Sequence, residues 1–159
     1  MDQTVQEKWQ WVEGTHALRT QLLDTLSDSE LNFTPGGENP TLGALLREMG
    51  EVQVSYTEAF KTLKQDWTYK NTDAGLDSSV ERLKSWFSDL DGNLKGVVTS
   101  FSADELNSKL IERGGGYNMP VGLQIDVYLQ ALLIFFGKIV VYFKAMSKDR
   151  PQQVEEWIG

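Results

Sequence analysis

The feature that most restricts how this chain can fold is its most apolar stretch, QALLIFFGKIVVYFKAM, which covers residues 130–146. A membrane-spanning helix needs about 20 apolar residues, and the window 127–146 is long enough. Gln130, Lys138 and Lys144 interrupt that window, however, and one lysine near the middle of a span costs about 3 kcal/mol on insertion scales. We therefore predict a buried core helix of a soluble protein and no membrane span.

Apolar residues recur at alternating steps of three and four in long segments, which is the periodicity of an amphipathic helix. In one of them the steps connect Val80, Leu83, Phe87 and Leu90. No segment shows the alternation that is typical of a strand. The pattern predicts an all-α fold, a four-helix bundle with one long crossover connection and with helices at residues 4–26, 40–63, 78–98 and 121–146.

Signals for helix starts and chain breaks support these boundaries. A capping box pairs a serine with a glutamate three residues later, and Asn-Pro suits the first turn of a helix. The glycine run at 114–116 predicts a flexible turn in the long connection that precedes the last helix. The start signals are Ser27 with Glu30, Asn39 with Pro40, Ser78 with Glu81, and Ser102 with Glu105.

Length and composition limit both the number of domains and the choice of partners. The 159 residues suit a single domain over 1–159, with a short helical tail at about 151–159. There is no cysteine, and the start of the chain lacks the cationic and apolar segments of a signal peptide. Fifteen basic against 23 acidic residues give a net charge of −8, which disfavours binding of nucleic acid. We expect a cytoplasmic protein with no nucleic-acid partner.

Two of the helical segments together resemble a known family. The segment NPTLGALLREMGEVQVSYTEAFK at residues 39–61 and the segment ALLIFFGKIVVYFKAM at residues 131–146 are similar to helices of the DinB-like (DinB/YfiT) superfamily of bacterial four-helix bundles. The resemblance covers about residues 5–146 in the order of the helices. It implies a four-helix bundle of the DinB-like type.

The resemblance also concerns a metal site, because members of that superfamily typically hold a divalent metal with three histidines. The matching positions in this chain are Glu48, Ala131 and Phe135, and Gly137 matches the glycine that follows the histidine pair. Alanine and phenylalanine cannot bind a metal, and a lone carboxylate cannot hold one tightly against water. We therefore expect no metal and no other cofactor, and we expect the ring of Phe135 to fill core space.

Four polar residues lie in or beside the apolar stripes of the expected helices. Glu48 and Gln53 belong to the second helix, and Asp126 and Gln130 belong to the fourth. Buried amides must be hydrogen-bonded, so these four residues could form a polar cluster inside the bundle, which is either structural or binds a ligand. The alternative for Glu48 is a boundary carboxylate that pairs with a neighbouring cation.

His16 and Tyr56 complete the candidate cavity residues. His16 is the only histidine and lies on the apolar face of the first expected helix. It is either a hydrogen-bonded core residue or a general base or single metal ligand that faces Glu48. Tyr56 is one of many tryptophan and tyrosine residues, most of which should pack in the core or between helices, while a few could line a pocket or a dimer face.

Three functions are consistent with these patterns. The first, and the one we favour, is a metal-free DinB-like protein that binds a small molecule or a protein without catalysis. The second is an enzyme, a divalent-metal-dependent transferase or hydrolase of the DinB/YfiT kind with a variant site around Glu48, His16 and Gln130. The third is a purely structural dimerisation module. The resemblance, together with an apolar content above what one bundle requires, also predicts a homodimer.

Overall fold

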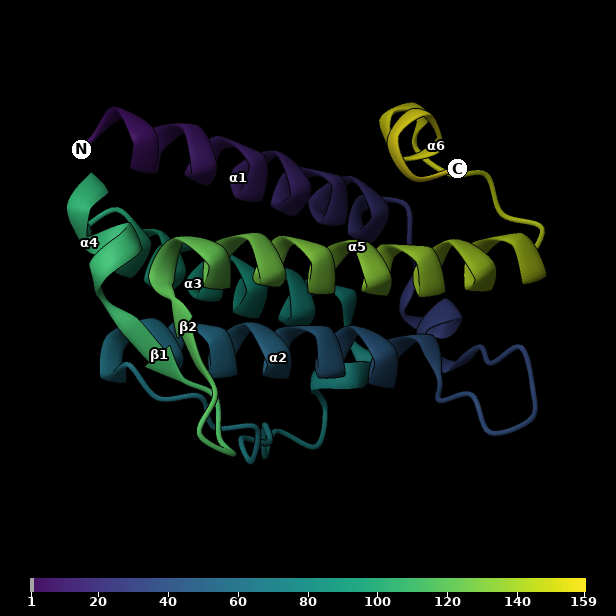
Figure 1. Cartoon of the computed structure of the whole chain (residues 1–159). Coiled ribbons are helices and arrows are strands. Elements are labelled where there is room, and N and C mark those ends of the chain that lie inside the picture. The colour runs from purple at the N-terminus through teal and green to yellow at the C-terminus, as the bar shows by residue number, and fades with distance from the viewer. Residues whose placement is uncertain (1) are drawn as a thin grey trace.

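The computed structural model describes residues 2–159, and most of this part of the chain is helical (Figure 1). The four long helices confirm the all-α class, and each of their ends lies within two residues of its predicted position. Two shorter helices, two 3₁₀ turns and one small hairpin complete the fold. In chain order the elements are α1 (Gln3–Asp24), a 3₁₀ turn (Asp28–Asn32), α2 (Leu42–Thr62), a second 3₁₀ turn (Leu76–Ser78), α3 (Val80–Val98), α4 (Ala103–Ser108), β1 (Leu110–Glu112), β2 (Asn118–Pro120), α5 (Val121–Ala145) and α6 (Gln152–Ile158).

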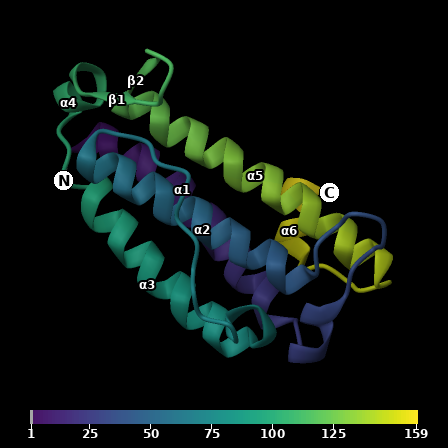
Figure 2. The ribbon, with the colours of Figure 1, turned by 90° about the horizontal axis from the view of Figure 1, so that it is seen from below.

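The long helices form two parallel pairs that run in opposite directions (Figures 1 and 2). Helices α1 and α5 run one way, and α2 and α3 run the other. Two ion pairs show that α1 and α3 are antiparallel neighbours. Lys95 near the end of α3 binds Glu13 in the middle of α1, and Lys84 near the start of α3 binds Asp24 at the end of α1. The bundle therefore has an up-down-down-up order.

The parallel arrangement of α2 and α3 requires a connection that returns along the whole length of α2, and residues 63–79 provide it. Near the start of this connection, Gln65 Nε2 donates a hydrogen bond to the backbone oxygen of Ser55 at 3.1 Å. Near its end, the backbone of Asp77 lies so close to Gly43 that a Cβ there would be 1.9 Å from the Asp77 oxygen. A long crossover is present as predicted, but it lies in this segment and not in the long connection before the last helix.

The connection from α3 to α5 holds a hairpin that the sequence patterns did not predict. Strands β1 and β2 pair antiparallel, with Ile111 opposite Met119, and both of these side chains are buried. The turn between them contains the glycine run at 114–116, and all three glycines have a positive φ. The turn was predicted correctly, but three-residue strands are too short for their alternation to be visible in the sequence.

The helix starts agree only in part with the predicted signals. Capping boxes are present at residues 27–30 and 102–105. The predicted cap at Asn39 is wrong, because Asn39 Nδ2 donates to a backbone oxygen within its own loop and Thr41 caps α2 instead. The predicted cap of the third helix is also displaced by one residue, since the side chain of Ser79 accepts the hydrogen bond from the first turn.

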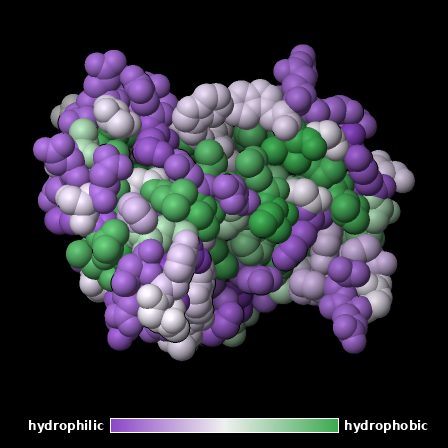
Figure 3. Space-filling view, viewed as in Figure 1, coloured by the Kyte–Doolittle hydropathy of each residue, from purple (hydrophilic) through white to green (hydrophobic). Residues whose placement is uncertain are grey.

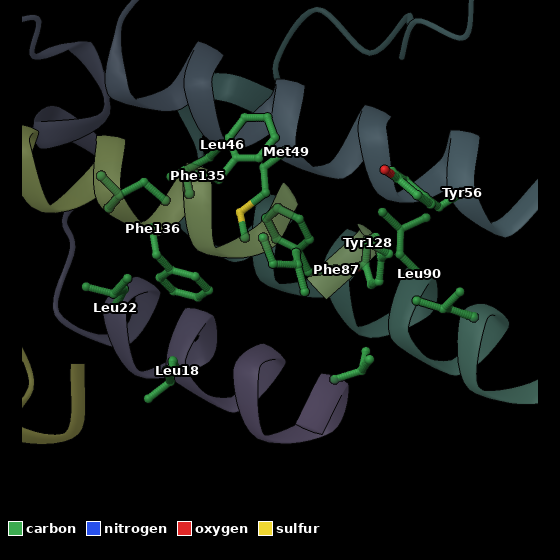
Figure 4. Packing of buried hydrophobic residues seen from close by; sticks show 14 of the residues in the cluster. Leu18, Leu22, Leu46, Met49, Tyr56, Phe87, Leu90, Tyr128, Phe135 and Phe136 are labelled. Atoms are coloured by element: carbon green, nitrogen blue, oxygen red, sulfur yellow. The ribbon is translucent and has the colours of Figure 1, made fainter. Parts of the chain in front are cut away.

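Helix α5 is the most apolar helix of the bundle, but the prediction that it is buried on most sides is wrong, because Leu133, Ile134 and Val141 on its outer side are exposed. By length and composition alone it could cross a membrane, but core helices of soluble proteins have the same properties. Its inner side packs into the hydrophobic core, where Phe135 lies beside Leu46 and Met49 of α2, and Phe136 faces α1 (Figure 4). Phe135 is only 6 % exposed, which confirms the prediction that its ring fills core space.

Candidate functional site

A buried polar network connects all four long helices. It contains His16 and Arg19 of α1, Gln53 of α2, Asp91 of α3 and Tyr128 of α5. Each of these residues lies three or four positions from a buried apolar residue of its own helix. The stripes that form the hydrophobic core therefore also carry these polar groups into the interior.

Asp91 is the acceptor at the centre of the network. Its carboxylate accepts hydrogen bonds from Arg19 Nη2 at 2.6 and 2.7 Å, from Gln53 Nε2 at 2.8 Å and from His16 Nδ1 at 3.0 Å. Burial alone would raise the pKa of Asp91, but the hydrogen bond from His16 and the charge of Arg19 outweigh burial and lower the pKa to about 2. Asp91 is therefore ionised at neutral pH and balances the charge of Arg19, whose side chain is fully buried.

The two partners of His16 determine its tautomer. Because Nδ1 faces the ionised Asp91 carboxylate, Nδ1 carries the proton and donates it to that acceptor. Nε2 is 2.8 Å from Tyr128 Oη and must then accept the tyrosine proton. Burial lowers the pKa of His16 and raises that of Tyr128, so both groups are neutral at pH 7. The network thus contains one compensated ion pair and two neutral groups.

A carboxylate, an imidazole and a hydroxyl that are linked by hydrogen bonds in this order also form the proton relay of many hydrolases. In such a relay the hydroxyl must reach the substrate, whereas Tyr128 is only 1 % exposed and its ring packs on Tyr56 at a centroid distance of 5.0 Å. Its hydroxyl donates into the protein interior. The network therefore has the geometry of a structural connection between helices and lacks an accessible nucleophile.

We expect the network to make stability depend on pH below about pH 7, where the unfolded chain begins to bind a proton at His16. The pKa of His16 is lowered in the folded state, so on acidification the unfolded chain binds a proton near pH 6.5 before the folded chain does. The free energy of unfolding should then decrease as the pH is lowered, by up to about 1.4 kcal/mol per pH unit. Urea unfolding at several pH values measures this slope, and His16→Gln should flatten it. Equal slopes for both proteins would contradict the assignment of His16.

Three of the predicted cavity residues do meet in this region. His16 and Gln53 share Asp91 as their acceptor, and Tyr56 packs on Tyr128. The prediction that most tryptophans and tyrosines pack inside is only partly fulfilled, because several are exposed. These exposed residues are Trp11, Trp67, Trp157, Tyr69 and Tyr117.

The predicted polar cluster of Glu48, Gln53, Asp126 and Gln130 is wrong. Glu48 and Gln130 are exposed, and Asp126 forms an ion pair with Lys8 of α1 at 2.6 Å. Of the two alternatives for His16, the structure shows the hydrogen-bonded core residue and not a residue that faces Glu48, since His16 is buried and both of its ring nitrogens are bonded to other residues. The cause is the rotation of α2 and α5 about their axes, which points these polar positions outward while Gln53 stays inside.

The sequence patterns did not identify Arg19 and Asp91 as members of the network. A signal was present, because Arg19 lies three residues after His16 and Asp91 lies four residues after the core residue Phe87. The guanidinium of Arg19 stacks on the ring of Phe87, 3.9 Å from its centroid. An arginine and an aspartate on the apolar faces of two different helices would have suggested a buried ion pair.

A second buried polar cluster attaches the crossover and the hairpin to the bundle. Gln124 of α5 is fully buried, and its Nε2 donates to Gln65 Oε1 at 2.6 Å. Arg113, in the turn between the strands, donates to Gln124 Oε1 at 3.1 Å. Because the amides of Gln65 and Gln124 are bonded to protein groups on both sides, this cluster is structural.

A surface groove of about 260 Å³ lies between α2 and α5, and we call it the α2–α5 groove. Glu48 and Lys138 line it, and no hydrogen bond or ion pair joins either side chain to another residue in the described range 2–159. Tyr142 Oη donates to the backbone oxygen of Pro40 at 2.7 Å, so the tyrosine ring is a fixed wall. The other lining residues are Asn39, Leu45 and Val141.

Only one of the three positions at which the resemblance places metal ligands lines this groove. Glu48 lines it, whereas Ala131 is half-buried and Phe135 is in the core. Of these three side chains only Glu48 offers a lone pair, and the cation of Lys138 lines the same groove. Within residues 2–159 no three histidine, cysteine, aspartate or glutamate side chains lie close enough together to hold a metal. This donor set does not fit a divalent metal.

Comparison with known proteins gives one family. The sequence model of the DinB superfamily matches residues 12–130, which include the C-terminal part of α1, all of α2 and α3, and the first part of α5. A search of curated proteins gives no match.

Proposed function

Because the chain belongs to the DinB superfamily, we propose that it is a bundle of this superfamily that binds a small organic molecule in the α2–α5 groove without a metal. One observation carries the proposal. Glu48 and Lys138 line the same groove with charges of opposite sign, and neither is neutralised by a residue in the described part of the chain. The side chain of Lys138 lies over the ring of Phe135 at 5.1 Å, which holds its charge beside the groove.

The lining of the groove indicates the chemical class of the ligand. A carboxylate and an ammonium on a wall that is otherwise apolar except for Asn39 suit a molecule that carries both charges and a short apolar group. The ligand's ammonium would pair with Glu48, its carboxylate with Lys138, and its apolar group would contact Leu45 and Tyr142. The volume of about 260 Å³ suits a ligand of the size of an amino acid.

A titration with L-leucine tests this proposal. Two-dimensional amide NMR should show shifts at Glu48 and Lys138 on addition of millimolar leucine. Each exposed ion pair contributes up to about 1 kcal/mol, so Glu48→Gln and Lys138→Gln should each weaken binding about fivefold. N-acetyl-leucine and leucinamide, which each lack one charge, should weaken it similarly.

Matched controls are available on the same two helices. Glu58→Gln on α2 and Lys144→Gln on α5 change exposed residues outside the groove and should leave leucine binding unchanged. If leucine shifts no resonance of the groove, or if the control variants weaken binding as much as the groove variants, the proposed site is wrong.

The proposal also predicts that divalent metals do not stabilise the fold. Glu48 alone among the matching positions offers a ligand atom, so chelation with EDTA should leave the melting temperature unchanged. Elemental analysis of the purified protein should find no stoichiometric zinc or nickel. One transition metal per chain that is lost in Glu48→Ala would overturn the proposal and support the enzyme instead.

The alternative of an enzyme with a variant site has less support from the geometry. It requires Glu48, His16 and Gln130 to act together. His16 is bonded to Asp91 and Tyr128 in the interior, whereas Glu48 and Gln130 are exposed. Binding in the α2–α5 groove is therefore the function that the arrangement supports best.

A further inference from the structure

A hollow of about 340 Å³ lies on the surface between the N-terminal parts of α1 and α5, and we call it the α1–α5 hollow. Figure 3 shows hydrophobic residues on the face of the molecule on which α1 and α5 lie in Figure 1. The hollow shares no lining residue with the α2–α5 groove, so the two are separate. Its apolar lining consists of Trp11, Val12, Ile125 and Leu129.

The indole ring of Trp11 gives the hollow an exposed aromatic surface. Trp11 is 63 % exposed, more than any other large hydrophobic residue in the range 2–159, and it does not belong to the hydrophobic core. Packing within the chain therefore does not explain a tryptophan at this position. The face of an indole ring attracts an organic cation more strongly than the ring of a tyrosine or a phenylalanine does.

The charges of the lining also favour a cation. Glu7 and Asp126 contribute two carboxylates, whereas Lys8 contributes one ammonium, so negative charge is in excess. The whole chain has a net charge of −8, which adds a long-range attraction for cations and a repulsion for anions. The hollow therefore suits an organic cation better than an anionic or a neutral ligand.

Hydrogen bonds within the chain narrow the class of cation. Lys8 Nζ donates to both carboxylate oxygens of Asp126, at 2.6 and 2.8 Å, and Gln3 Nε2 donates to Glu7 Oε1 at 3.1 Å. A primary ammonium or a guanidinium brings several N–H groups that each need an acceptor, and most of the carboxylate oxygens in this lining already accept a hydrogen bond. A quaternary ammonium has no N–H group, so it needs no acceptor and its methyl groups can pack on apolar side chains.

We propose that the α1–α5 hollow binds a small quaternary ammonium compound. The cation lies against the ring of Trp11, its methyl groups contact Val12 and Leu129, and the carboxylates of Glu7 and Asp126 balance its charge. The volume of the hollow is at the lower end of the range for small-molecule pockets, which limits the ligand to the quaternary group and a short chain. This site goes beyond the proposed function, because it differs from the α2–α5 groove in place and in ligand.

A titration with choline, a small quaternary ammonium compound, tests the proposal. Two-dimensional NMR resolves the indole N–H groups of the five tryptophans. Millimolar choline should shift the signal of Trp11 and leave that of Trp157, which is also exposed, unchanged. The neutral carbon analogue of choline, in which a tert-butyl group replaces the trimethylammonium group, has the same shape. It should bind at least about fivefold more weakly, because it is not attracted to the ring or to the carboxylates.

Variants on α1 separate the two attractions, with binding followed by the amide signal of Leu129. Trp11→Leu should weaken choline binding about two- to fivefold, and Trp11→Phe should weaken it less, because phenylalanine still offers an aromatic face. Glu7→Gln should weaken it by up to about fivefold. Glu13→Gln changes an exposed carboxylate of the same helix outside the hollow and should bind choline as the wild type does. Because these three positions are exposed, every variant should keep the melting temperature of the wild type.

Two results would overturn the proposal. One is that choline shifts no resonance of the hollow. The other is that the neutral carbon analogue binds as tightly as choline, which would make the hollow a site for apolar molecules without charge. Leucine binding in the α2–α5 groove depends on other residues and should be the same in Trp11→Leu as in the wild type, so the two proposals fail separately.

Discussion

Asp91→Ala should lower the free energy of unfolding by about 3 kcal/mol, the lower end of the effect of removing one partner of a buried ion pair, because Arg19 is buried whereas the side chain of Asp91 is 28 % exposed. The reason lies in Arg19, which is fully buried. Its Nη2 atom forms two short hydrogen bonds, and both of them go to the carboxylate of Asp91. Without Asp91 its charge is left in the interior with only Gln53 Oε1 as an acceptor, at 3.0 Å. His16 and Gln53 lose an acceptor in the same substitution. Urea unfolding followed by circular dichroism measures the change.

Two comparisons make this result specific. Asp89→Ala removes an exposed carboxylate from the same helix and should change stability by less than about 0.5 kcal/mol. The double variant Arg19→Met with Asp91→Ala removes both charges and should be more stable than Asp91→Ala alone, because no unpaired charge remains. If the double variant were the less stable of the two, the interaction of Arg19 with Asp91 would not be the main effect.

Phe135→Ala should lower the free energy of unfolding by about 3–5 kcal/mol, as is usual for a buried phenylalanine. The ring is 6 % exposed and lies beside Leu46 and Met49 in the core (Figure 4). Its removal leaves a cavity that the rigid helices α2 and α5 can close only in part. Thermal or urea unfolding measures the loss.

Leu133→Ala is the matched control for Phe135→Ala. It truncates a residue of α5 that is 42 % exposed, and it should lower the free energy of unfolding by about 1 kcal/mol or less. An unchanged melting midpoint in Phe135→Ala would mean that the ring is not part of the core. The core position of residue 135 and its proposed replacement of a metal ligand would then both be wrong.

The elements that were predicted correctly depend on signals within one helix. Steps of three and four placed α1, α2, α3 and α5, and serine–glutamate pairs placed two of the capping boxes. Such signals report which side of a helix is apolar, because residues three and four apart share one face. Phe135 was expected in the core for another reason, because the resemblance places its ring where relatives hold a metal ligand.

The polar site was predicted much less well, and the residues show why. His16 and Gln53 were expected inside, but the sequence does not say that both bind Asp91, which is 75 and 38 residues further along the chain. Glu48 lies at the edge of an apolar stripe, so a small rotation of α2 decides whether it is buried or exposed. The order of the helices in the bundle then decides which side chains meet.

The sequence by itself determined the all-α class and the extent of the four long helices, because these follow from periodicity and local hydrogen bonding. The tertiary structure alone decided the parallel pairing of α2 with α3, the network around Asp91, and the place of Glu48 and Lys138 in one surface groove. The physical reason is that a helical pattern fixes directions only around its own axis. The partners of each side chain depend on how four such axes rotate and pack together, and that is set by the whole core at once.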